Sequence, residues 1–353
     1  MKEIPIDQLR IIDANLNRIG EGLRVLEEFA RLSLNDTALT QQLKNMRHKM
    51  VSVDKELQSQ LLRARDAEGD VGSDMEADGE DKSRDVSEVI IANARRVQES
   101  LRVMEEMAKA PGLALNSDEY RKARFALYTL EKELLSRILR KDKIKRLAGL
   151  YVIIDTAWLK GRSHVEVASR VIRGGAKVIQ LRCKERGIKE FLSIARDLKK
   201  LCSEQGVLFI VNDSLEVALA ADADGLHIGQ EDLPAATTRR LLPIDKILGC
   251  SVRTVDEARV ARSDGADYLG VGAIYPTSTK EAIEVIGLAK LEEIRQAVDL
   301  PIVAIGGINK RNLKAVMKAG ADAAAVISAV MEAADVEKAT RQMVNIIEEE
   351  ERG

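Results

Sequence analysis

From about residue 149 to the end of the chain, short apolar segments alternate with longer amphipathic ones. The apolar segments are rich in β-branched residues and lack polar alternation, which is typical of strands buried on both faces of a parallel sheet. Eight such segments are expected strands: Leu150–Ile154, Val178–Leu181, Leu208–Val211, Gly225–Ile228, Ile247–Ser251, Tyr268–Ile274, Pro301–Ile305 and Ala323–Ile327. The stretches between them predict helices, among them Lys189–Ser203, Val255–Arg262, Leu288–Val298 and Arg311–Ala319.

Eight buried strands joined by helices predict an α/β fold of the (β/α)8 TIM-barrel type. A doubly wound open sheet is the alternative. The count of eight strands and the absence of a Gly-rich dinucleotide loop after the first strand favour the barrel.

Polar residues stand at the carboxyl end of nearly every expected strand, which is the face that carries the chemistry in such barrels. They are Gln180, Arg182, Cys183 and Lys184 after the second strand, Asn212 and Asp213 after the third, Gln230 and Asp232 after the fourth, Ser251 on the fifth, Thr277, Ser278, Thr279 and Lys280 after the sixth, Gly306 and Gly307 after the seventh, and Ile327 and Ser328 at the eighth. We therefore expect all of them around one mouth, with the last two loops presenting backbone N–H groups to phosphate before helices, the first of which begins near Asn309.

The charges on this rim indicate an anionic ligand. Asp213 and Asp232 form either a general acid–base couple or a pair of oxygen ligands for Mg²⁺, which takes one or two carboxylates together with water and phosphate. Arg182, Lys184 and Lys280 supply more positive charge than a monophosphate needs. The set suits a diphosphate leaving group.

Residues from about 149 to 347 resemble the thiamine-phosphate synthase family. The matching motifs are Gln180-Leu181-Arg182-x-Lys184, Val211-Asn212-Asp213, Gly225-Leu226-His227-Ile228-Gly229-Gln230-x-Asp232, Pro276-Thr277-Ser278-Thr279-Lys280, Ile305-Gly306-Gly307-Ile308 and Val326-Ile327-Ser328. The resemblance implies a transferase that joins a pyrimidine diphosphate to a thiazole phosphate. One departure is Cys183, which stands where the family usually has Glu.

The resemblance also implies roles for individual residues. The pyrimidine diphosphate is expected at Gln180, Leu181, Arg182, Cys183, Lys184, Asn212, Ser251 and Lys280, of which Arg182, Lys184, Ser251 and Lys280 are the expected catalytic residues. The thiazole phosphate is expected at Thr277, Ser278, Thr279, Gly307, Ile327 and Ser328, and Mg²⁺ at Asp213 and Asp232. For His227, inside the fourth strand, a packed structural role is favoured.

The first 145 residues contain no convincing strand and predict a helical bundle, with residues 146–353 forming the barrel. Expected helices are Leu9–Leu32, Leu39–Leu62, Val86–Lys109 and Ser117–Lys143. The stretch Leu23–Glu28 matches Leu101–Glu106, and Arg47–Leu57 parallels Arg124–Leu134, which predicts a duplicated helical hairpin. Its acidic, Gly-rich middle, Ala64 to Ser87, is expected to be a crossover loop.

Both copies carry Asn, Arg and Glu residues three positions apart on one helix stripe: Asn15, Arg18, Glu21 and Arg24 in the first, and Asn93, Arg96, Glu99 and Arg102 in the second. They could line an anion pocket, but solvated ion-pair faces are the favoured interpretation.

The overall composition agrees with a cytoplasmic enzyme, and the resemblance implies small phosphorylated substrates. A net charge of −2 and a pI near 6.1 argue against nucleic-acid binding, and no apolar run reaches membrane-spanning length. Three irregularly spaced cysteines predict neither a disulfide framework nor a zinc site. Two alternatives stay open, a thiazole tautomerase on the same scaffold and a non-enzymatic sensor, and a homo-oligomer is compatible with either. The paired acids and Arg182/Lys184 favour the transferase over the tautomerase.

Overall fold

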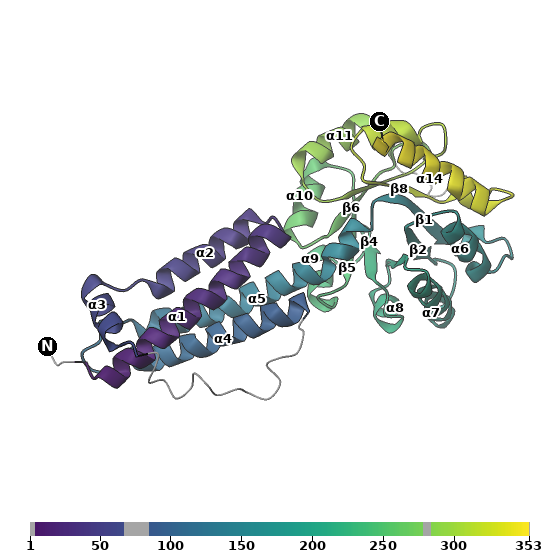
Figure 1. The fold of residues 1–353 in the computed structure, drawn as a ribbon. Coiled ribbons are helices and arrows are strands. Elements are labelled where there is room, and N and C mark those ends of the chain that lie inside the picture. The colour runs from purple at the N-terminus through teal and green to yellow at the C-terminus, as the bar shows by residue number, and fades with distance from the viewer. Residues whose placement is uncertain (1–3, 67–84, 278–283, 353) are drawn as a thin grey trace. The chain divides into compact units, whose positions relative to one another are not determined.

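The computed structural model describes residues 4–66, 85–277 and 284–352. The chain divides into two compact units, Met1–Leu139 and Arg140–Gly353. The first is helical and the second is a barrel of parallel strands (Figure 1). Helix α5 (Ser117–Lys145) extends beyond the end of the first unit, so the charged segment 141–145 belongs to a continuous helix.

The eight strands close into a barrel in sequence order, with β8 paired to β1 and every pair parallel. The strands are β1 (Gly149–Asp155), β2 (Val178–Arg182), β3 (Leu208–Asn212), β4 (Gly225–Ile228), β5 (Ile247–Val252), β6 (Tyr268–Val271), β7 (Ile302–Ile305) and β8 (Ala323–Val326). The predicted TIM barrel is therefore confirmed, and most strands lie within one or two residues of the predicted positions.

The strand β6 is shorter than predicted. The sequence extends it to Ile274, but the strand ends at Val271. A Cβ at Gly272 would lie 2.1 Å from the carbonyl oxygen of Ile305, so glycine allows the chain to cross close to the end of β7. Beyond it, the N–H of Ile274 donates to that same oxygen at 2.9 Å.

Helices follow the strands and cover the outside of the barrel (Figure 1). They are η2 (Thr156–Trp158), α6 (His164–Arg173), α7 (Ile188–Glu204), α8 (Leu215–Ala220), α9 (Ala235–Leu241), α10 (Val255–Ser263), α11 (Gly287–Ala297), α12 (Leu313–Lys318), α13 (Ser328–Met331) and α14 (Val336–Arg352).

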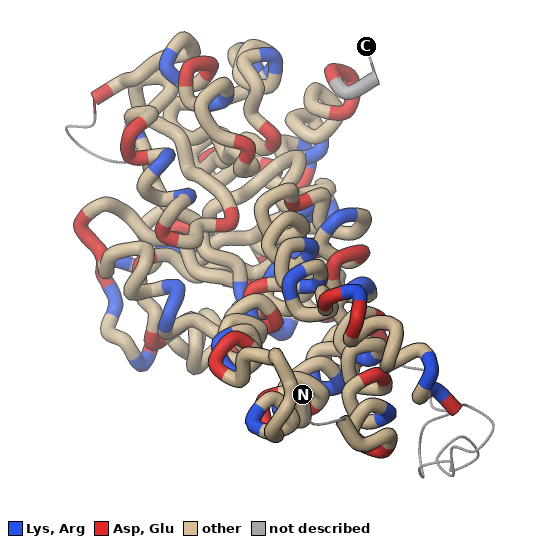
Figure 2. Tube along the Cα trace, turned by 90° about the vertical axis from the view of Figure 1, so that its left-hand side faces the viewer, with Lys and Arg blue, Asp and Glu red and all other residues tan. Residues whose placement is uncertain are grey.

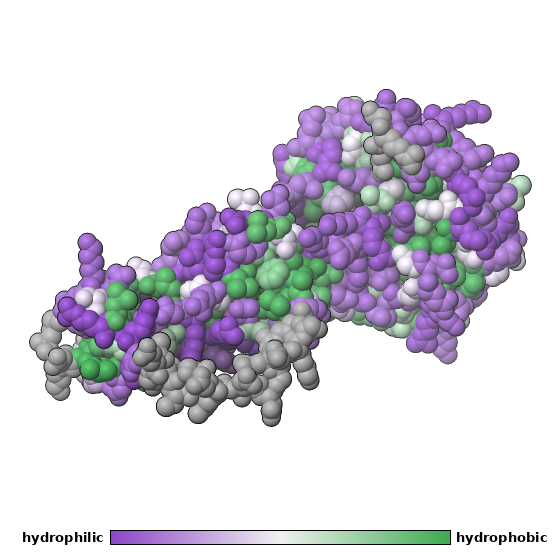
Figure 3. All heavy atoms as spheres, in the orientation of Figure 1, coloured by the Kyte–Doolittle hydropathy of each residue, from purple (hydrophilic) through white to green (hydrophobic). Residues whose placement is uncertain are grey.

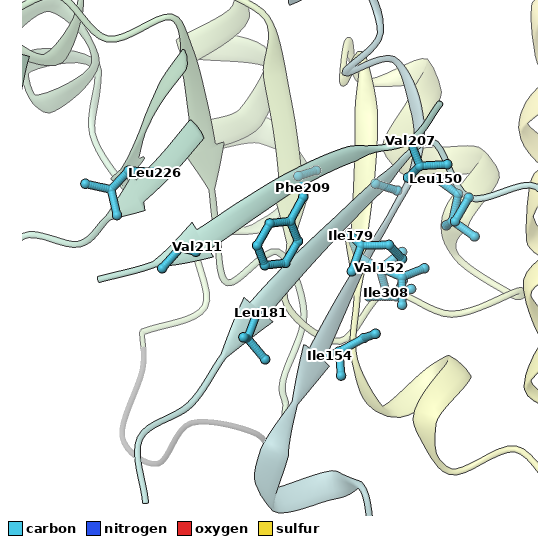
Figure 4. Packing of buried hydrophobic residues seen from close by; sticks show 14 of the residues in the cluster. Leu150, Val152, Ile154, Ile179, Leu181, Val207, Phe209, Val211, Leu226 and Ile308 are labelled. Carbon is cyan, nitrogen blue, oxygen red and sulfur yellow. The ribbon is translucent and has the colours of Figure 1, made fainter. Parts of the chain in front are cut away.

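Alternation along each strand separates two hydrophobic cores. On β1, Leu150, Val152 and Ile154 belong to the core between the strands and the helices (Figure 4). Tyr151 and Ile153 belong to a second core inside the barrel. Since successive side chains of a strand point to opposite faces, the same alternation decides which residue after each strand can reach the barrel mouth.

The first unit contains α1 (Ile6–Glu28), a π-helical turn η1 (Phe29–Ser33), α2 (Thr37–Val51), α3 (Lys55–Ala64), α4 (Val86–Met107) and α5. Helix α1 packs against α2, α3 and α4 around one aliphatic core. Most of the expected crossover loop between residues 64 and 87 lies outside the described residues.

The single helix predicted over Leu39–Leu62 is wrong, because α2 ends at Val51 and α3 begins at Lys55. Asp54 caps α3 by accepting a hydrogen bond from the N–H of Leu57 at 2.8 Å. Short Asp side chains favour such caps. At the matching position of the second copy stands Glu131, and there α5 continues unbroken.

The sequence repeat places the same buried ion cluster in both copies. Glu27 is 3% exposed and pairs with Arg24 and Arg47, each at 2.9 Å. Its repeat, Glu105, pairs with Arg102 at 2.8 Å and Arg124 at 2.9 Å. Arg18, Glu21, Arg96 and Glu99 are exposed, in keeping with solvated faces, whereas Asn15 is buried and Asn93 half-buried, and each donates to a carbonyl oxygen of its own helix.

The surface carries interspersed charges of both signs, without a long stretch of one sign along the trace in Figure 2. In the view of Figure 3, hydrophilic residues cover most of the visible barrel surface, with hydrophobic atoms scattered between them. None of the described helices is long and apolar enough to cross a bilayer.

Candidate active site

A pocket opens at the carboxyl end of the barrel strands, and most of the predicted site residues line it. The described residues that were predicted and line it are Gln180, Arg182, Lys184, Asn212, Asp213, Ser251, Thr277, Gly307, Ile327 and Ser328. Residues from strands on opposite sides of the barrel therefore face one cavity. Ser278, Thr279 and Lys280 lie outside the described residues.

The cationic side of the pocket is built on β2. Arg182, the last residue of β2, donates from Nη1 to Asp155 Oδ2 at the end of β1. Asp155 is 1% exposed, and its second oxygen accepts from the N–H of Ala157 at 3.1 Å. The guanidinium is thus fixed by a buried carboxylate, while Lys184 Nζ lies 3.5 Å from Asp213 Oδ2.

Two carboxylates meet beside these cations. Asp213 follows β3 with φ +65°, and its N–H donates to the carbonyl oxygen of His227 at 2.8 Å. Asp232 lies within hydrogen-bonding reach of Asp213, and its Oδ2 accepts from the N–H of Gly229 at 2.7 Å. Burial and the neighbouring Asp232 charge raise the pKa of Asp213, and Lys184 opposes that rise.

This pair of acids fits a hard divalent cation. Two adjacent carboxylates repel each other unless a proton or a cation lies between them. Among the described residues, no group of three or more His, Cys, Asp or Glu side chains could form an all-protein cage. A site with one or two carboxylates that leaves positions for water and phosphate is the arrangement that Mg²⁺ favours, whereas Zn²⁺ and Ca²⁺ take more protein ligands.

A chain of hydrogen bonds crosses the interior of the barrel through residues that line the pocket. Ser251 Oγ lies 3.0 Å from His227 Nε2, and His227 Nδ1 lies 3.1 Å from the hydroxyl of Tyr268. That hydroxyl is 3.1 Å from the hydroxyl of Tyr151, to which Gln180 Nε2 donates at 2.8 Å. Burial lowers the pKa of His227 to about 4, so the imidazole is neutral near neutral pH. Both nitrogens of His227 are engaged, and the residue lines the pocket. The packed structural role that the sequence favoured did not place it there.

The opposite side of the pocket is formed by the loops after β6, β7 and β8. Gly306 and Gly307 have φ +102° and +63°, and a Cβ at Gly307 would lie 2.4 Å from the carbonyl oxygen of Pro276. Only glycine allows this close approach of two backbones. The helix expected near Asn309 begins instead at Leu313, because turns tied by the Asn309 and Asn312 side chains precede it.

Two predicted substrate-binding residues do not line the pocket. Leu181 is fully buried in the core between strands and helices, and Cys183 is 9% exposed in the same core. Figure 4 shows Leu181 among the side chains of that cluster. Strand alternation accounts for this placement: Gln180, Arg182 and Lys184 line the pocket, so the side chains between them point outward.

Among the site residues that sequence reasoning missed are Asp155, Tyr151 and Tyr268. Asp155 is a charged residue at the end of β1, one residue beyond the predicted end of that strand. Tyr151 and Tyr268 lie inside strands, where the sequence pattern treats them as apolar, yet both carry hydroxyls. The sequence could have indicated both residues, because a Tyr in a buried strand needs a hydrogen-bond partner for its hydroxyl.

The comparisons with known proteins agree with this geometry. Residues 150–330 match the family model described as thiamine monophosphate synthase. The chain is 37% identical to the thiamine-phosphate synthase of Thermosynechococcus vestitus, over 95% of this chain and 93% of that one. With that of Gloeobacter violaceus it shares 38% identity, over 94% of each chain. This chain belongs to the thiamine-phosphate synthase family.

The barrel also resembles a solved thiamine phosphate pyrophosphorylase from Pyrococcus furiosus, with a TM-score of 0.54 and 44% identity over 58% of this chain and 98% of that chain. Residues 10–133 match the model of the ThiD2 family. The chain is thus an enzyme of thiamine phosphate synthesis, and enzymes of this family use a metal ion. An N-terminal extension precedes its synthase barrel.

Proposed function

We propose that the pocket binds 4-amino-2-methyl-5-(diphosphooxymethyl)pyrimidine and 4-methyl-5-(2-phosphooxyethyl)thiazole together and joins them to give thiamine phosphate and diphosphate. The observation that supports this most is the division of the pocket into two sides. Cations and carboxylates gather after β2, β3 and β4, while glycine and hydroxyl groups gather after β6, β7 and β8. Two phosphorylated substrates would each find a separate anion site.

The reaction needs little covalent help from the protein. The bond between the pyrimidine CH₂ carbon and the diphosphate oxygen breaks, and its electron pair leaves with the oxygen. The electron-rich aminopyrimidine stabilises the resulting cation. The thiazole nitrogen then donates its lone pair to that carbon, so no proton has to be transferred when the C–N bond forms.

On this proposal, the pyrimidine diphosphate is held by Gln180, Arg182, Lys184, Asn212 and Ser251, together with Lys280 outside the described residues. Arg182 is the main contributor, because Asp155 orients its guanidinium before substrate arrives. A preoriented donor stabilises the charge of the departing group without rearrangement, and removing one such donor costs about 3–4 kcal/mol of transition-state stabilisation.

Asp213 and Asp232 would hold the metal ion, which we assign as Mg²⁺, and the bound ion would supply Lewis-acid stabilisation of the diphosphate. Lys184 Nζ lies 3.5 Å from Asp213 Oδ2, where its charge offsets that of Asp213 in the ligand-free pocket.

The thiazole phosphate would bind at Thr277, Gly307, Ile327 and Ser328, together with Ser278 and Thr279 outside the described residues. The close approach of Gly307 to the segment after β6 brings the two loops together. This side contributes binding and orientation, which convert the attack of the thiazole nitrogen into a reaction between held partners.

The three free cysteines are all buried and form no disulfide. They are compatible with a reducing compartment, so the cytoplasmic location expected from the sequence remains part of the proposal.

The test is direct turnover. Purified protein with both substrates and Mg²⁺ should form thiamine phosphate and release diphosphate in equal amounts. Arg182→Gln should lower kcat by about 100-fold or more. Arg186→Gln is the matched control, because Arg186 lies in the loop that follows β2, pairs with Glu190 and does not line the pocket. Equal losses in both variants, or no product from the wild-type protein, would contradict the proposal.

A further inference from the structure

The hydrogen-bond chain inside the barrel joins Gln180 and Ser251 through three other residues that line the pocket. Gln180 and Ser251 stand at its ends, on β2 and β5, and Tyr151, Tyr268 and His227 connect them from β1, β6 and β4. The two end residues are predicted to bind the pyrimidine diphosphate. The connecting residues have no assigned role.

The barrel makes room for these rings at two glycines. A Cβ at Gly249 would lie 2.1 Å from Tyr268 Cζ and 2.5 Å from His227 Nδ1. A Cβ at Gly270 would lie 2.7 Å from His227 Cε1. Any larger residue at either position would displace the rings from their hydrogen bonds. The hydrogen-bond chain therefore depends on one glycine in β5 and one in β6.

The Gln180 end sets the direction of the chain when each member donates its proton to the next one. Each Tyr hydroxyl has one proton, and a neutral imidazole has one N–H and one acceptor nitrogen. Gln180 donates to Tyr151, and a chain that uses every proton then has Tyr151 donating to Tyr268 and Tyr268 donating to His227 Nδ1, across contacts of 3.1 Å each. The imidazole proton then lies on Nε2 and is donated to Ser251, which leaves the Ser251 proton for the pocket.

We propose that Tyr151, Tyr268 and His227 are positioning residues that set the hydrogen-bond direction at both ends of this chain, so that Gln180 presents an acceptor and Ser251 a donor to one ligand ring. The reverse direction would require the Gln180 amide to turn over, and Ser251 would then donate to His227 instead of to the ligand. The five residues thus form a relay that couples the hydrogen-bond role of Gln180 to that of Ser251.

The ligand that fits this arrangement carries a donor and an acceptor on the same edge. A 4-aminopyrimidine does so, with an amino group for the Gln180 carbonyl and a ring nitrogen for the Ser251 hydroxyl. This assignment rests on the proposed function. It adds that recognition of the aminopyrimidine depends on three residues that do not need to touch it.

The decisive variant is Tyr268→Phe, which removes one hydroxyl from the middle of the relay and keeps the ring. We expect kcat/KM for the pyrimidine diphosphate to fall about tenfold, the value of one hydrogen bond to a ligand, while the KM for the thiazole phosphate stays within about twofold. Thr340→Val is the control, because Thr340 is also fully buried, donates to the carbonyl oxygen of Val336 within α14 and does not line the pocket. It should leave both substrates unaffected.

A double-mutant cycle distinguishes a role of Tyr268 in the hydrogen-bond relay from a role in holding the barrel together. If Tyr268 acts through Ser251, then Tyr268→Phe should add less than about twofold to the loss caused by Ser251→Ala, because coupled residues are not additive. Additive losses would overturn the relay. So would equal changes in the KM values of both substrates, since a merely loosened barrel would affect both.

A spectroscopic measurement tests the direction without turnover. In ¹⁵N-histidine-labelled protein, His227 should show a protonated Nε2 and an accepting Nδ1, and Tyr268→Phe should abolish this preference. His227→Gln assigns the signal among the three histidines of the chain. An unchanged tautomer in Tyr268→Phe would overturn the proposal. Absence of turnover in the wild-type protein would instead contradict the proposed function and leave this measurement intact.

Discussion

Asp155 and Arg182 form a buried ion pair between the ends of β1 and β2, in which the carboxylate is almost completely enclosed and the guanidinium lines the pocket. The pair connects the barrel core to the anion site. Arg182 alone would rotate freely among several rotamers, whereas the carboxylate holds its planar group in one orientation.

Asp155→Asn should therefore lower activity, although Asp155 itself does not line the pocket. The neutral amide keeps the size of the carboxylate but loses the charge that orients Arg182. We expect kcat/KM for the pyrimidine diphosphate to fall by about 10- to 100-fold, the range that small misplacement of a catalytic group can cause. Steady-state kinetics with each substrate varied in turn measures this.

The control for this variant is Asp197→Asn. Asp197 is an exposed carboxylate whose partner is His164, away from the pocket. Activity should remain close to that of wild type. If Asp155→Asn also retained full activity, Arg182 would not depend on the ion pair for its orientation.

The pair of acids leads to a prediction on stability. Burial and Asp232 raise the pKa of Asp213, so its ionised form costs stability, and this cost grows as the pH rises through that pKa. With chelator present, Asp213→Asn should melt at a higher temperature than wild type at about pH 7, and the advantage should vanish at about pH 4. Asn tolerates the left-handed backbone of this position, so the substitution adds no strain.

Mg²⁺ should reverse this order of stability. The ion should raise the melting temperature of wild type by binding the folded state, but it should not stabilise Asp213→Asn. The control is Asp222→Asn, because Lys246 lowers the pKa of Asp222 and this substitution should not stabilise the protein. Activity of wild type should disappear with chelator and return with Mg²⁺, and full turnover in excess chelator would contradict the metal assignment.

Gly307 offers a test of the thiazole side. Its φ is +63°, and the Cβ of an alanine at this position would lie 2.4 Å from the carbonyl oxygen of Pro276. Gly307→Ala must therefore move the loop after β6 or the loop after β7. We expect the KM for the thiazole phosphate to rise by about tenfold or more, the value of one lost phosphate contact, with a smaller effect on the pyrimidine diphosphate.

Gly187→Ala is the matched control for that substitution. Gly187 has φ −66°, and nothing lies within 4 Å of its Cβ position. It should behave like wild type. A Gly307→Ala variant that bound both substrates normally would show that the thiazole phosphate does not use this loop.

The barrel could be predicted from the sequence because its strands are short, apolar and separated by helical periodicity. The site could be predicted in part, since parallel strands bring their carboxyl ends together. Strand alternation excludes Leu181 and Cys183 from the pocket, although both stand inside a motif whose other members line it. Asp155, Tyr151 and Tyr268 were missed because their roles depend on pairs between different strands, which the linear order does not show.

The bundle gives a similar lesson at the level of single residues. The repeat predicted paired helices, and the buried clusters around Glu27 and Glu105 match in both copies. The break between α2 and α3 was missed because it rests on one difference between the copies, Asp54 against Glu131. A single capping residue decided where a helix ends, against an otherwise continuous apolar pattern.

The last prediction concerns where a separate barrel can begin. Sequence motifs alone suggest a start near Lys143. In the structure, Arg140 lies in the barrel unit, is 8% exposed and pairs through Nε with Asp267 at 2.9 Å. Asp267 is itself buried, also contacts Arg239 at 3.3 Å, and accepts from the N–H of Leu248 at 2.8 Å.

A fragment that starts at Lys143 removes one of two cations from this buried carboxylate. Removing one partner of a buried ion pair costs about 3–5 kcal/mol, and the remaining Arg239 should reduce that loss to about 1–3 kcal/mol. A fragment that starts at Ser136 keeps Arg140 and should unfold at a clearly higher denaturant concentration. Both should retain synthase activity when folded, because the residues that line the pocket begin at Tyr151 on β1.

The comparison is controlled by Arg140→Met in the longer fragment, which keeps the chain length but removes the charge. This variant should be as unstable as the shorter fragment in urea unfolding. If it were as stable as its parent, the loss in the shorter fragment would come from the missing helical residues instead. A folded fragment of either length without synthase activity would show that the bundle completes the active site.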